Sequence, residues 1–141
     1  MRILVINGPN LDVLGAREPQ VYGTMSLWDI ENRLKQRYAR VTFEFYQSNS
    51  EGGMIDALHK AMDGSVTGVV LNPGAYAHYS YAVRDAVSSL KVPVVEVHLS
   101  NVYAREEFRR QSVIAPVCKG VIAGFAVRGY EMAIDYLLQQ D

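Results

Sequence analysis

The stretch "RILVINGPNLDVLGAREPQVYG", residues 2–23, joins a continuously apolar run to a long loop punctuated by glycine and proline. A short run of large aliphatic residues predicts a strand that is covered on both faces. Runs of this kind occupy residues 2–6, 41–46, 66–71, 92–97 and 117–122. The second run, "VTFEFY", alternates between apolar and polar residues, so we expect it at an edge of the sheet.

Helical patterns lie between these runs. Apolar residues recur at helical spacing in residues 26–38, 50–62, 82–90, 106–110 and 130–138. Ser26 with Asp29 predicts a capping box at the start of the first helix, and Met54, Leu58 and Met62 mark one face of the second. Regular alternation of strand and helix predicts a parallel sheet with right-handed crossovers and helices on both faces. The expected fold is α/β, a flavodoxin-like three-layer sandwich of strand order 2-1-3-4-5, in one domain over residues 1–141.

The composition narrows the classes of partner. The chain has 141 residues, with 14 Lys plus Arg against 15 Asp plus Glu, so its net charge of -1 gives no general attraction for nucleic acid or anionic lipid. No apolar stretch reaches the roughly 18 residues of a membrane span, and the chain starts with a strand-like run rather than a secretory signal. Cys118 stands alone in an apolar, strand-like context, which predicts an inert core thiol, no metal site and a cytoplasmic protein.

Polar side chains concentrate where the predicted strands end. In doubly wound sheets, ligands bind beyond the carboxyl ends of the strands, near the switch between the first and third strands. That rule selects the loops at residues 7–23, 72–79 and 98–104. These loops and the end of the fourth strand carry Asn10, Arg17, Tyr22, Asn72, His78, Glu96, His98 and Ser100. Alternation along a strand places Glu96 and His98 on one face, so acid–base and hydrogen-bonding groups concentrate where the fold would bring them together.

Other classes that share this architecture lack their required residues. Neither G-x-G-x-x-G nor G-x-x-x-x-G-K-[ST] occurs, which argues against a dinucleotide or nucleotide site. A response-receiver domain needs acidic residues where this chain has Asn7 and Asn72. A cysteine phosphatase needs its cysteine in an anion-binding loop, whereas Cys118 is expected within a strand.

Each candidate residue also has a structural alternative. Tyr22 is one of nine tyrosines and could be an amphipathic surface residue, and Arg17 could be solvated. Asn10, after a proline, could form a turn. His98 could be a buried imidazole whose nitrogens are hydrogen-bonded within the protein. His59, in the second predicted helix, is assigned a structural role.

Two arginines follow the fourth strand. Arg105 and Arg109, at i and i+4, are expected on one helix face. They could bind a polar ligand or pair with Glu106 and other acids. The spacing alone leaves both options open.

Four long motifs decide between these alternatives by resemblance. "NGPNLDVLGAREPQVYG" (7–23), "QSNSEG" (47–52), "NPGAYAHYSYAVRDA" (72–86) and "VPVVEVHLSNVYAREEFR" (92–109) closely resemble the type II 3-dehydroquinate dehydratases. The similarity extends from the first strand to the last helix. It implies dehydration of 3-dehydroquinate to 3-dehydroshikimate without metal or organic cofactor, in shikimate biosynthesis or quinate breakdown. It also implies a flavodoxin-like subunit assembled as a dodecamer of four trimers.

The resemblance assigns roles to the acid–base residues. Tyr22 corresponds to the base and Arg17 to the cation that activates it, since a phenol of ordinary pKa about 10 is a poor base and a nearby guanidinium favours the phenolate. Asn10 corresponds to the residue that holds a water against the enolate. His98 corresponds to the general acid, and Glu96 is expected to orient its imidazole.

The expected substrate-binding residues are Asn72, Gly74, His78, Asp85, Leu99, Ser100, Arg105 and Arg109. The resemblance implies that Asn72, Leu99 and Ser100 hold the substrate carboxylate, while His78 and Arg109 meet ring hydroxyls. Asp85 corresponds to a residue that reaches the substrate of a neighbouring subunit.

Some positions depart from the family pattern, namely Tyr79, Tyr81, Tyr103, Val113 and Ala115. They affect lid packing and contacts between subunits rather than matched catalytic positions. The three tyrosines are the support for an alternative function, a non-catalytic binding paralogue for a cyclic polyol acid. A type I enzyme with a lysine Schiff base is excluded, because it needs a barrel of more than about 200 residues and no lysine lies in the three site loops.

Overall fold

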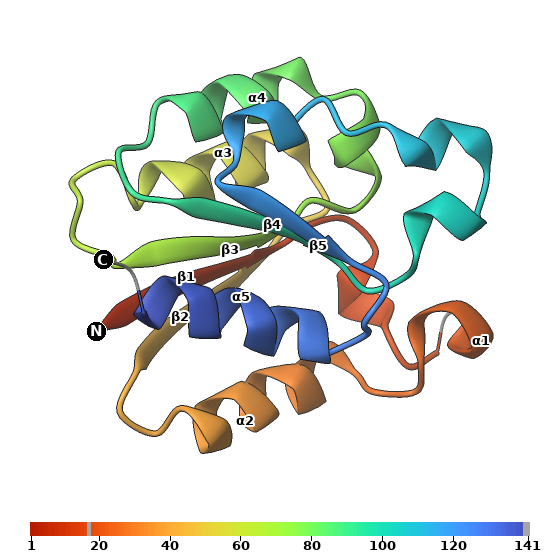
Figure 1. Ribbon diagram of the computed structural model, residues 1–141, viewed down its shortest axis with the longest axis horizontal. Helices are drawn as coiled ribbons and strands as arrows, with labels where there is room; N and C mark the ends of the chain where they lie inside the picture. The colour runs from red at the N-terminus through yellow and green to blue at the C-terminus, as the bar shows by residue number, and fades with distance from the viewer. Residues whose placement is uncertain (17, 140–141) are drawn as a thin grey trace.

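The computed structural model describes residues 1–16 and 18–139 and shows a parallel sheet between two layers of helices (Figure 1). The strands are β1 (Arg2–Asn7), β2 (Thr42–Gln47), β3 (Gly68–Asn72), β4 (Val94–His98) and β5 (Gly120–Ala123). Their order is β2-β1-β3-β4-β5, which confirms the predicted order and places β2 at an edge. All strands run parallel, so their carboxyl ends meet at one edge of the sheet.

The helices of the described part of the chain cover both faces of the sheet. They are α1 (Pro19–Tyr22), α2 (Leu27–Arg37), α3 (Glu51–His59), α4 (Tyr81–Ser88) and α5 (Arg128–Leu138). Helices α3 and α4 lie on one face, and α2 and α5 lie on the other (Figure 1). Short 3₁₀ turns are η1 (Leu11–Val13), η2 (Gly74–His78), η3 (Val102–Ala104), η4 (Glu107–Arg110) and η5 (Ala115–Val117). Among the described residues, no helix has the length and apolarity that a bilayer span requires.

Alternate side chains of β1 point to opposite faces of the sheet, and both faces are buried, which explains why the strand is continuously apolar. Ile3 and Val5 pack into the core beneath α2 and α5, whereas Leu4 and Ile6 pack into the separate core beneath α3 and α4. All four side chains are at most 1% exposed. A strand that faces two apolar layers has no solvent side, so both sets of alternate positions are apolar.

Serine side chains start three of the helices. The Ser26 hydroxyl accepts a hydrogen bond from the Asp29 backbone N–H, and the Asp29 carboxylate accepts one from the Ser26 N–H, which confirms the predicted capping box. The Ser50 and Ser80 hydroxyls cap α3 and α4 by accepting hydrogen bonds from the backbone N–H groups of Gly53 and Val83. The Ser80 hydroxyl also donates to the Glu51 carboxylate at 2.5 Å and so joins the two helices at their amino ends.

Two sequence-based boundaries were wrong. The strand expected at residues 117–122 begins at Gly120, and Cys118 lies between η5 and β5 rather than within a strand. Pro116 in η5 has no N–H for a strand ladder and instead favours the turn. Burial raises the pKa of Cys118 to about 12, so the half-buried thiol stays protonated, as expected for an inert cysteine. Helix α3 ends at His59, which leaves Met62 48% exposed.

The loops after β1 and β3 touch each other at Gly8. Its backbone N–H donates to the carbonyl of Asn72 at 2.8 Å. A Cβ atom at Gly8 would lie 2.6 Å from the carbonyl oxygen of Pro73, closer than real Cβ contacts allow. Glycine is therefore required here by the close approach of two backbones.

Replacement of Gly8 tests this contact. We expect Gly8→Ala to lower the free energy of unfolding by about 1–3 kcal/mol, because the two loops must separate to admit the methyl group. Gly52→Ala is the matched control, since Gly52 is an exposed residue of α3 with nothing within 4 Å of the new Cβ atom. It should stabilise the helix by up to about 1 kcal/mol. Urea unfolding of both variants measures the difference, and equal stabilities would contradict the contact.

Candidate active site

A pocket lies at the carboxyl ends of β1, β3 and β4. Ten of the predicted site residues line it: Asn10, Tyr22, Asn72, Gly74, His78, His98, Leu99, Ser100, Arg105 and Arg109. The parallel register explains the convergence, since Asn7 at the end of β1 pairs with Asn72 at the end of β3. Of the remaining predicted residues, Glu96 lies behind the pocket wall, and Arg17 lies outside the described residues.

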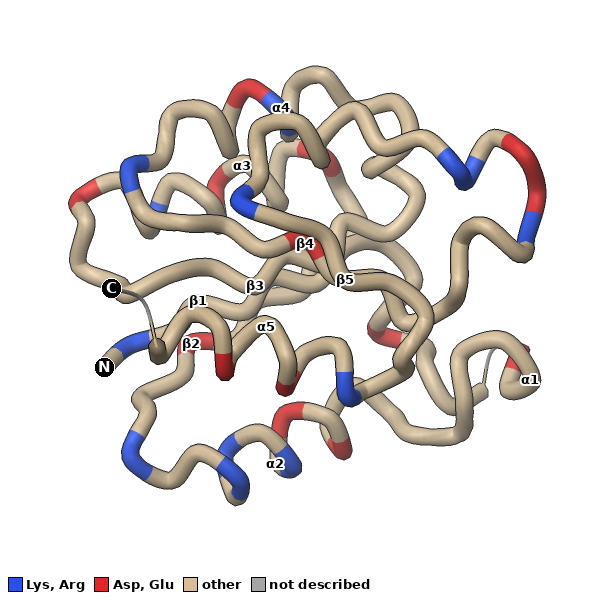
Figure 2. Tube along the Cα trace, in the orientation of Figure 1, with Lys and Arg blue, Asp and Glu red and all other residues tan. Residues whose placement is uncertain are grey.

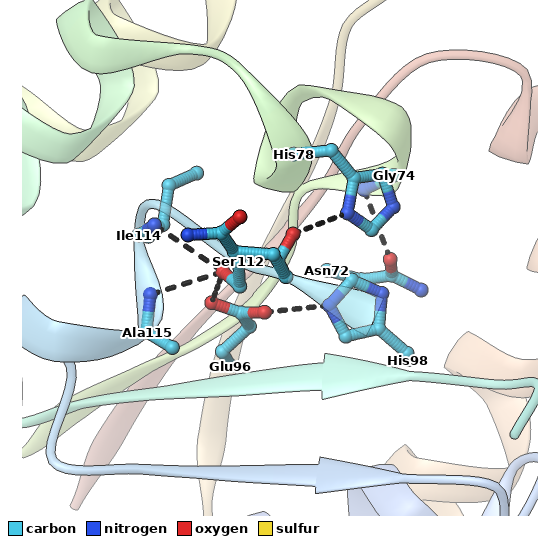
Figure 3. Close-up of polar contacts among 9 residues, drawn as sticks. Asn72, Gly74, His78, Glu96, His98, Ser112, Ile114 and Ala115 are labelled. Atoms are coloured by element: carbon cyan, nitrogen blue, oxygen red, sulfur yellow. Dashed lines mark hydrogen bonds and ion pairs between the residues drawn. The ribbon is translucent and has the colours of Figure 1, made fainter. Parts of the chain in front are cut away.

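Glu96 and His98 form the most deeply buried ionisable pair of the site (Figure 3). His98 Nε2 lies 2.6 Å from Glu96 Oε2, and the two side chains share one face of β4, as predicted. Because a carboxylate only accepts, Nε2 carries a hydrogen in this contact. Nδ1 is then the ring nitrogen that remains for a ligand in the pocket.

Ser112 completes the surroundings of Glu96. Its hydroxyl donates to Glu96 Oε1 at 2.9 Å and accepts from the backbone N–H groups of Ile114 and Ala115 (Figure 3). Both oxygens of the buried carboxylate therefore have partners, as a buried charge requires. Sequence reasoning missed Ser112, since its one signal was a serine just before an apolar turn.

His78 lies over His98. The two rings stack with centroids 6.1 Å apart, and Phe108 meets His78 edge-on at 5.9 Å. His78 Nδ1 lies 2.8 Å from the carbonyl oxygen of Gln111, which can only accept, so Nδ1 carries the hydrogen. Burial, with smaller contributions from His98 and Arg109, lowers the pKa of His78. The neutral ring thus offers Nε2 as an acceptor.

Arg105 lies beside Tyr22, a contact that the sequence did not reveal. Its guanidinium carbon is 5.1 Å from the centroid of the Tyr22 ring, and its Nη1 donates to the Ser100 hydroxyl at 3.1 Å. Since the Ser100 oxygen accepts this bond, its own hydrogen is left to donate. The arrangement joins a cation, a phenol and a hydroxyl in one wall of the pocket.

The predicted helix face shared by Arg105 and Arg109 was wrong. Arg105 directly follows η3 and Arg109 belongs to η4, so no single helix contains both. Glu106 between them accepts from Arg109 Nε at 3.1 Å, and this bond lowers the pKa of Glu106. Figure 2 shows the acidic turn flanked by basic residues in the loop after β4. Both arginines still line the pocket.

Residues at the end of β2 and just after it support the loop that carries Asn10. Asn10 adopts a left-handed conformation with φ 69°, and its backbone N–H donates to Asn49 Oδ1 at 2.9 Å. Gln47 Nε2 donates to the carbonyl of Gly8 at 3.1 Å and to Asn49 Oδ1 at 3.0 Å. These bonds hold the start of the first loop against the end of β2.

Asp85 is not brought to this pocket. It is an exposed residue of α4 and does not line the cavity of its own chain. A wider surface hollow lies near the start of β4 and β5, lined by apolar residues with Lys91, Lys119 and Tyr136. Its described lining residues include no carboxylate–histidine pair, so the polar pocket is the better candidate for chemistry.

No metal cluster was expected, and among the described residues no group of three or more His, Cys, Asp or Glu is placed to hold a metal ion. The polar groups of the pocket are hydrogen-bond donors, an imidazole pair and guanidinium groups. Such a set suits an anionic ligand with hydroxyl groups and proton transfer to or from it.

Comparison with known proteins shows extensive similarity. The family described as dehydroquinase class II matches residues 1–138. A 3-dehydroquinate dehydratase of Bacillus subtilis is 58% identical over 139 residues, which cover 97% of this chain and 93% of the relative. The crystal structure of a type II dehydroquinase from Butyrivibrio crossotus superposes with a TM-score of 0.95 at 48% identity, over 99% of this chain and 98% of that one. A 3-dehydroquinate dehydratase-like protein from Bifidobacterium longum is more distant, with a TM-score of 0.71 and 29% identity over 99% of both chains.

The lowered pKa of His78 predicts a pH dependence of stability. As pH falls through the ordinary histidine value of 6.5, the unfolded chain takes up a proton that folded His78 resists. The contribution is therefore complete above that pH and is lost as the pH falls through the lowered pKa of folded His78. We expect His78→Gln to make the free energy of unfolding fall less steeply over this range.

Urea unfolding at several pH values measures the two slopes. His59→Gln, at the exposed end of α3, controls for the loss of an imidazole as such. Identical slopes for the parent protein and His78→Gln would contradict the assignment.

Proposed function

Because this chain belongs to the dehydroquinase class II family, we propose that it dehydrates 3-dehydroquinate to 3-dehydroshikimate by general acid–base catalysis in the described pocket. The observation that carries the proposal is the buried Glu96–His98 pair on the wall of a pocket that also contains Tyr22. Tyr22, His98 and Glu96 occur together at this pocket, which favours the enzyme over the non-catalytic alternative.

The first step is removal of a proton from the carbon next to the ketone. Tyr22, as phenolate, takes this proton, and the electron pair moves onto the carbonyl oxygen to give an enolate. The guanidinium carbon of Arg105 lies 5.1 Å from the centroid of the Tyr22 ring, so Arg105 places positive charge beside the base. Arg17 is assigned the same electrostatic role by the family resemblance. Asn10, on the pocket wall, holds a water that stabilises the enolate oxygen.

The second step expels the hydroxyl group as water. The enolate electrons form the new carbon–carbon double bond while the carbon–oxygen bond breaks. His98 supplies the proton to the leaving oxygen from Nδ1, because Nε2 is bound to Glu96. Glu96 stabilises the imidazolium and fixes the plane of the ring.

Binding follows from the donors of the pocket. The Ser100 hydroxyl, the Asn72 amide and the backbone of Leu99 hold the substrate carboxylate. Nε2 of His78 accepts from a ring hydroxyl, and Arg109 donates to another. Gly74, with φ 59°, keeps the turn after β3 close to the ligand.

Assembly is part of the same proposal. Asp85 lies outside its own pocket and is exposed on α4, as a residue that serves a neighbouring subunit would be. Tyr79 and Tyr81, which precede and start this helix, are 60% and 66% exposed and are suited to contacts between subunits. The proposed assembly is a dodecamer of four trimers. A cytoplasmic location is also proposed, and the protonated thiol of Cys118 is compatible with it.

Substitution of the acid and the base tests the mechanism. We expect Tyr22→Phe and His98→Asn each to lower kcat by about 10²–10⁴-fold, because each removes one proton-transfer group. The assay mixes purified protein with 3-dehydroquinate and follows the absorbance of the conjugated enone product. Tyr136→Phe is the control, since it removes the hydroxyl of a tyrosine of α5 that is 44% exposed and outside the lining of this pocket. No product from the parent protein at any pH would refute the function, and near-normal kcat in either variant would refute the assigned role.

Asp85 provides a test of assembly. We expect Asp85→Asn to lower kcat/KM by about tenfold, because a charged hydrogen-bond partner is lost from the neighbouring site. Asp56→Asn, an exposed carboxylate on α3, is the matched control. Sedimentation velocity of the parent protein should show an oligomer. A fully active monomer, or an unaffected Asp85→Asn variant, would contradict the shared site.

A further inference from the structure

A buried phenol lies under the point where the strand order switches. Tyr130, in the first turn of α5, is 0% exposed. Its hydroxyl donates to Asn7 Oδ1 at 2.5 Å and accepts from Asn72 Nδ2 at 2.9 Å. Asn7 and Asn72 are paired in register as the last residues of β1 and β3. The start of α5 lies near the carboxyl ends of the strands (Figure 1), so this helix brings the phenol to the base of the pocket.

The direction of these hydrogen bonds is determined by chemistry. Burial raises the pKa of Tyr130, so the phenol keeps its single hydrogen. That hydrogen goes to the Asn7 oxygen, and the hydroxyl must therefore accept from Asn72. On the other side, Asn72 Oδ1 accepts from the backbone N–H of Gly74 at 3.2 Å.

Asn72 consequently has one satisfied orientation. Rotation of its amide by 180° would turn the NH₂ group toward the Gly74 N–H, a donor against a donor. It would also turn Oδ1 toward a Tyr130 hydroxyl whose hydrogen is already used. In the observed orientation, Nδ2 has two hydrogens and Tyr130 takes one of them, which leaves one for a ligand.

We propose that Tyr130 is a positioning residue, which holds the Asn72 amide so that one Nδ2–H is presented to the carboxylate of the substrate. This inference rests on the proposed function of the pocket and adds a residue that does not line it. The opposite amide orientation would present an oxygen to an anion, which repels it. Tyr130 therefore acts on substrate affinity through Asn72 and takes no part in proton transfer.

The first test separates binding from chemistry. We expect Tyr130→Phe to raise KM for 3-dehydroquinate about three- to tenfold while kcat stays within about twofold, because a preset donor contributes to binding alike in the ground and transition states. In an Asn72→Ala background, Tyr130→Phe should produce no further rise in KM. An unchanged KM in the single variant, or an equal rise in both backgrounds, would overturn the proposal.

Tyr38→Phe is the matched control for lost stability. The Tyr38 hydroxyl donates its hydrogen to Asp135 Oδ1 at 2.6 Å and lies 3.0 Å from the Glu131 carbonyl oxygen, but it is away from the pocket. Both variants lose a tyrosine hydroxyl, so both should unfold at lower urea concentration. Only Tyr130→Phe should change KM. A comparable KM change in Tyr38→Phe would show that general loosening, rather than positioning, is responsible.

A spectroscopic test requires neither turnover nor a stable Tyr130 variant. In the ¹⁵N-labelled parent protein, the side-chain NH₂ signals of Asn72 are assigned by their loss in Asn72→Ala. We expect one of the two hydrogens to exchange with solvent at least about tenfold more slowly than the other, because it is held by a buried phenol. Equal, rapid exchange of both hydrogens would refute the positioning role. If the parent protein shows no dehydration, the proposed function fails, while this measurement still decides whether Tyr130 orients Asn72.

Discussion

Burial of the Glu96 carboxylate is the constraint on which the site depends. The side chain is 0% exposed, and a charge so far from water is tolerated only when its oxygens are paired. His98 binds one oxygen and Ser112 the other, and Ser112 is itself fixed by the backbone that leads into η5. The segment between β4 and β5 is therefore folded back onto the end of β4. Since this same segment carries Arg105 and Arg109, satisfying one buried carboxylate also brings the guanidinium groups to the pocket.

The order of the sheet was predictable because strands buried on both faces leave a clear sequence pattern. The continuously apolar runs and the Ser26 capping box each depend on a few adjacent residues, and the structure confirms them. The predicted start of the last strand was too early because the run at residues 117–122 overlaps the end of a proline-containing turn. The periodicity of apolar residues does not reveal such a turn. Met62 was assigned to a buried helix face because the pattern continued past the point at which α3 ends. The predicted boundaries of strands and helices were thus wrong where the apolar pattern continues beyond the end of the strand or helix.

The convergence of the site loops was also predictable, since parallel strands must end at one edge of the sheet. The contacts within that edge were not. Ser112 lies 16 positions from Glu96, and Tyr130 lies 58 positions from Asn72 and 123 from Asn7, so no local pattern links them. The contact between Arg105 and the Tyr22 ring likewise joins two separate loops. The sequence therefore indicated the polar residues that line the pocket, but it did not indicate Ser112 and Tyr130, which hold some of them in place.

The supports of the pocket come from opposite faces of the sheet. Val70 of β3 packs on the α5 side, so Asn72, two residues later, shares that side with Tyr130. Val94 of β4 packs on the α3 and α4 side, and Glu96 follows it there with Ser112. The Asn72 amide and the Glu96–His98 pair are therefore held by different layers, and the β3–β4 pairing is what relates them. Since Tyr130 and Val94 pack in separate cores, the proposed mechanism allows a change in α5 to alter substrate affinity without moving the Glu96–His98 pair on β4.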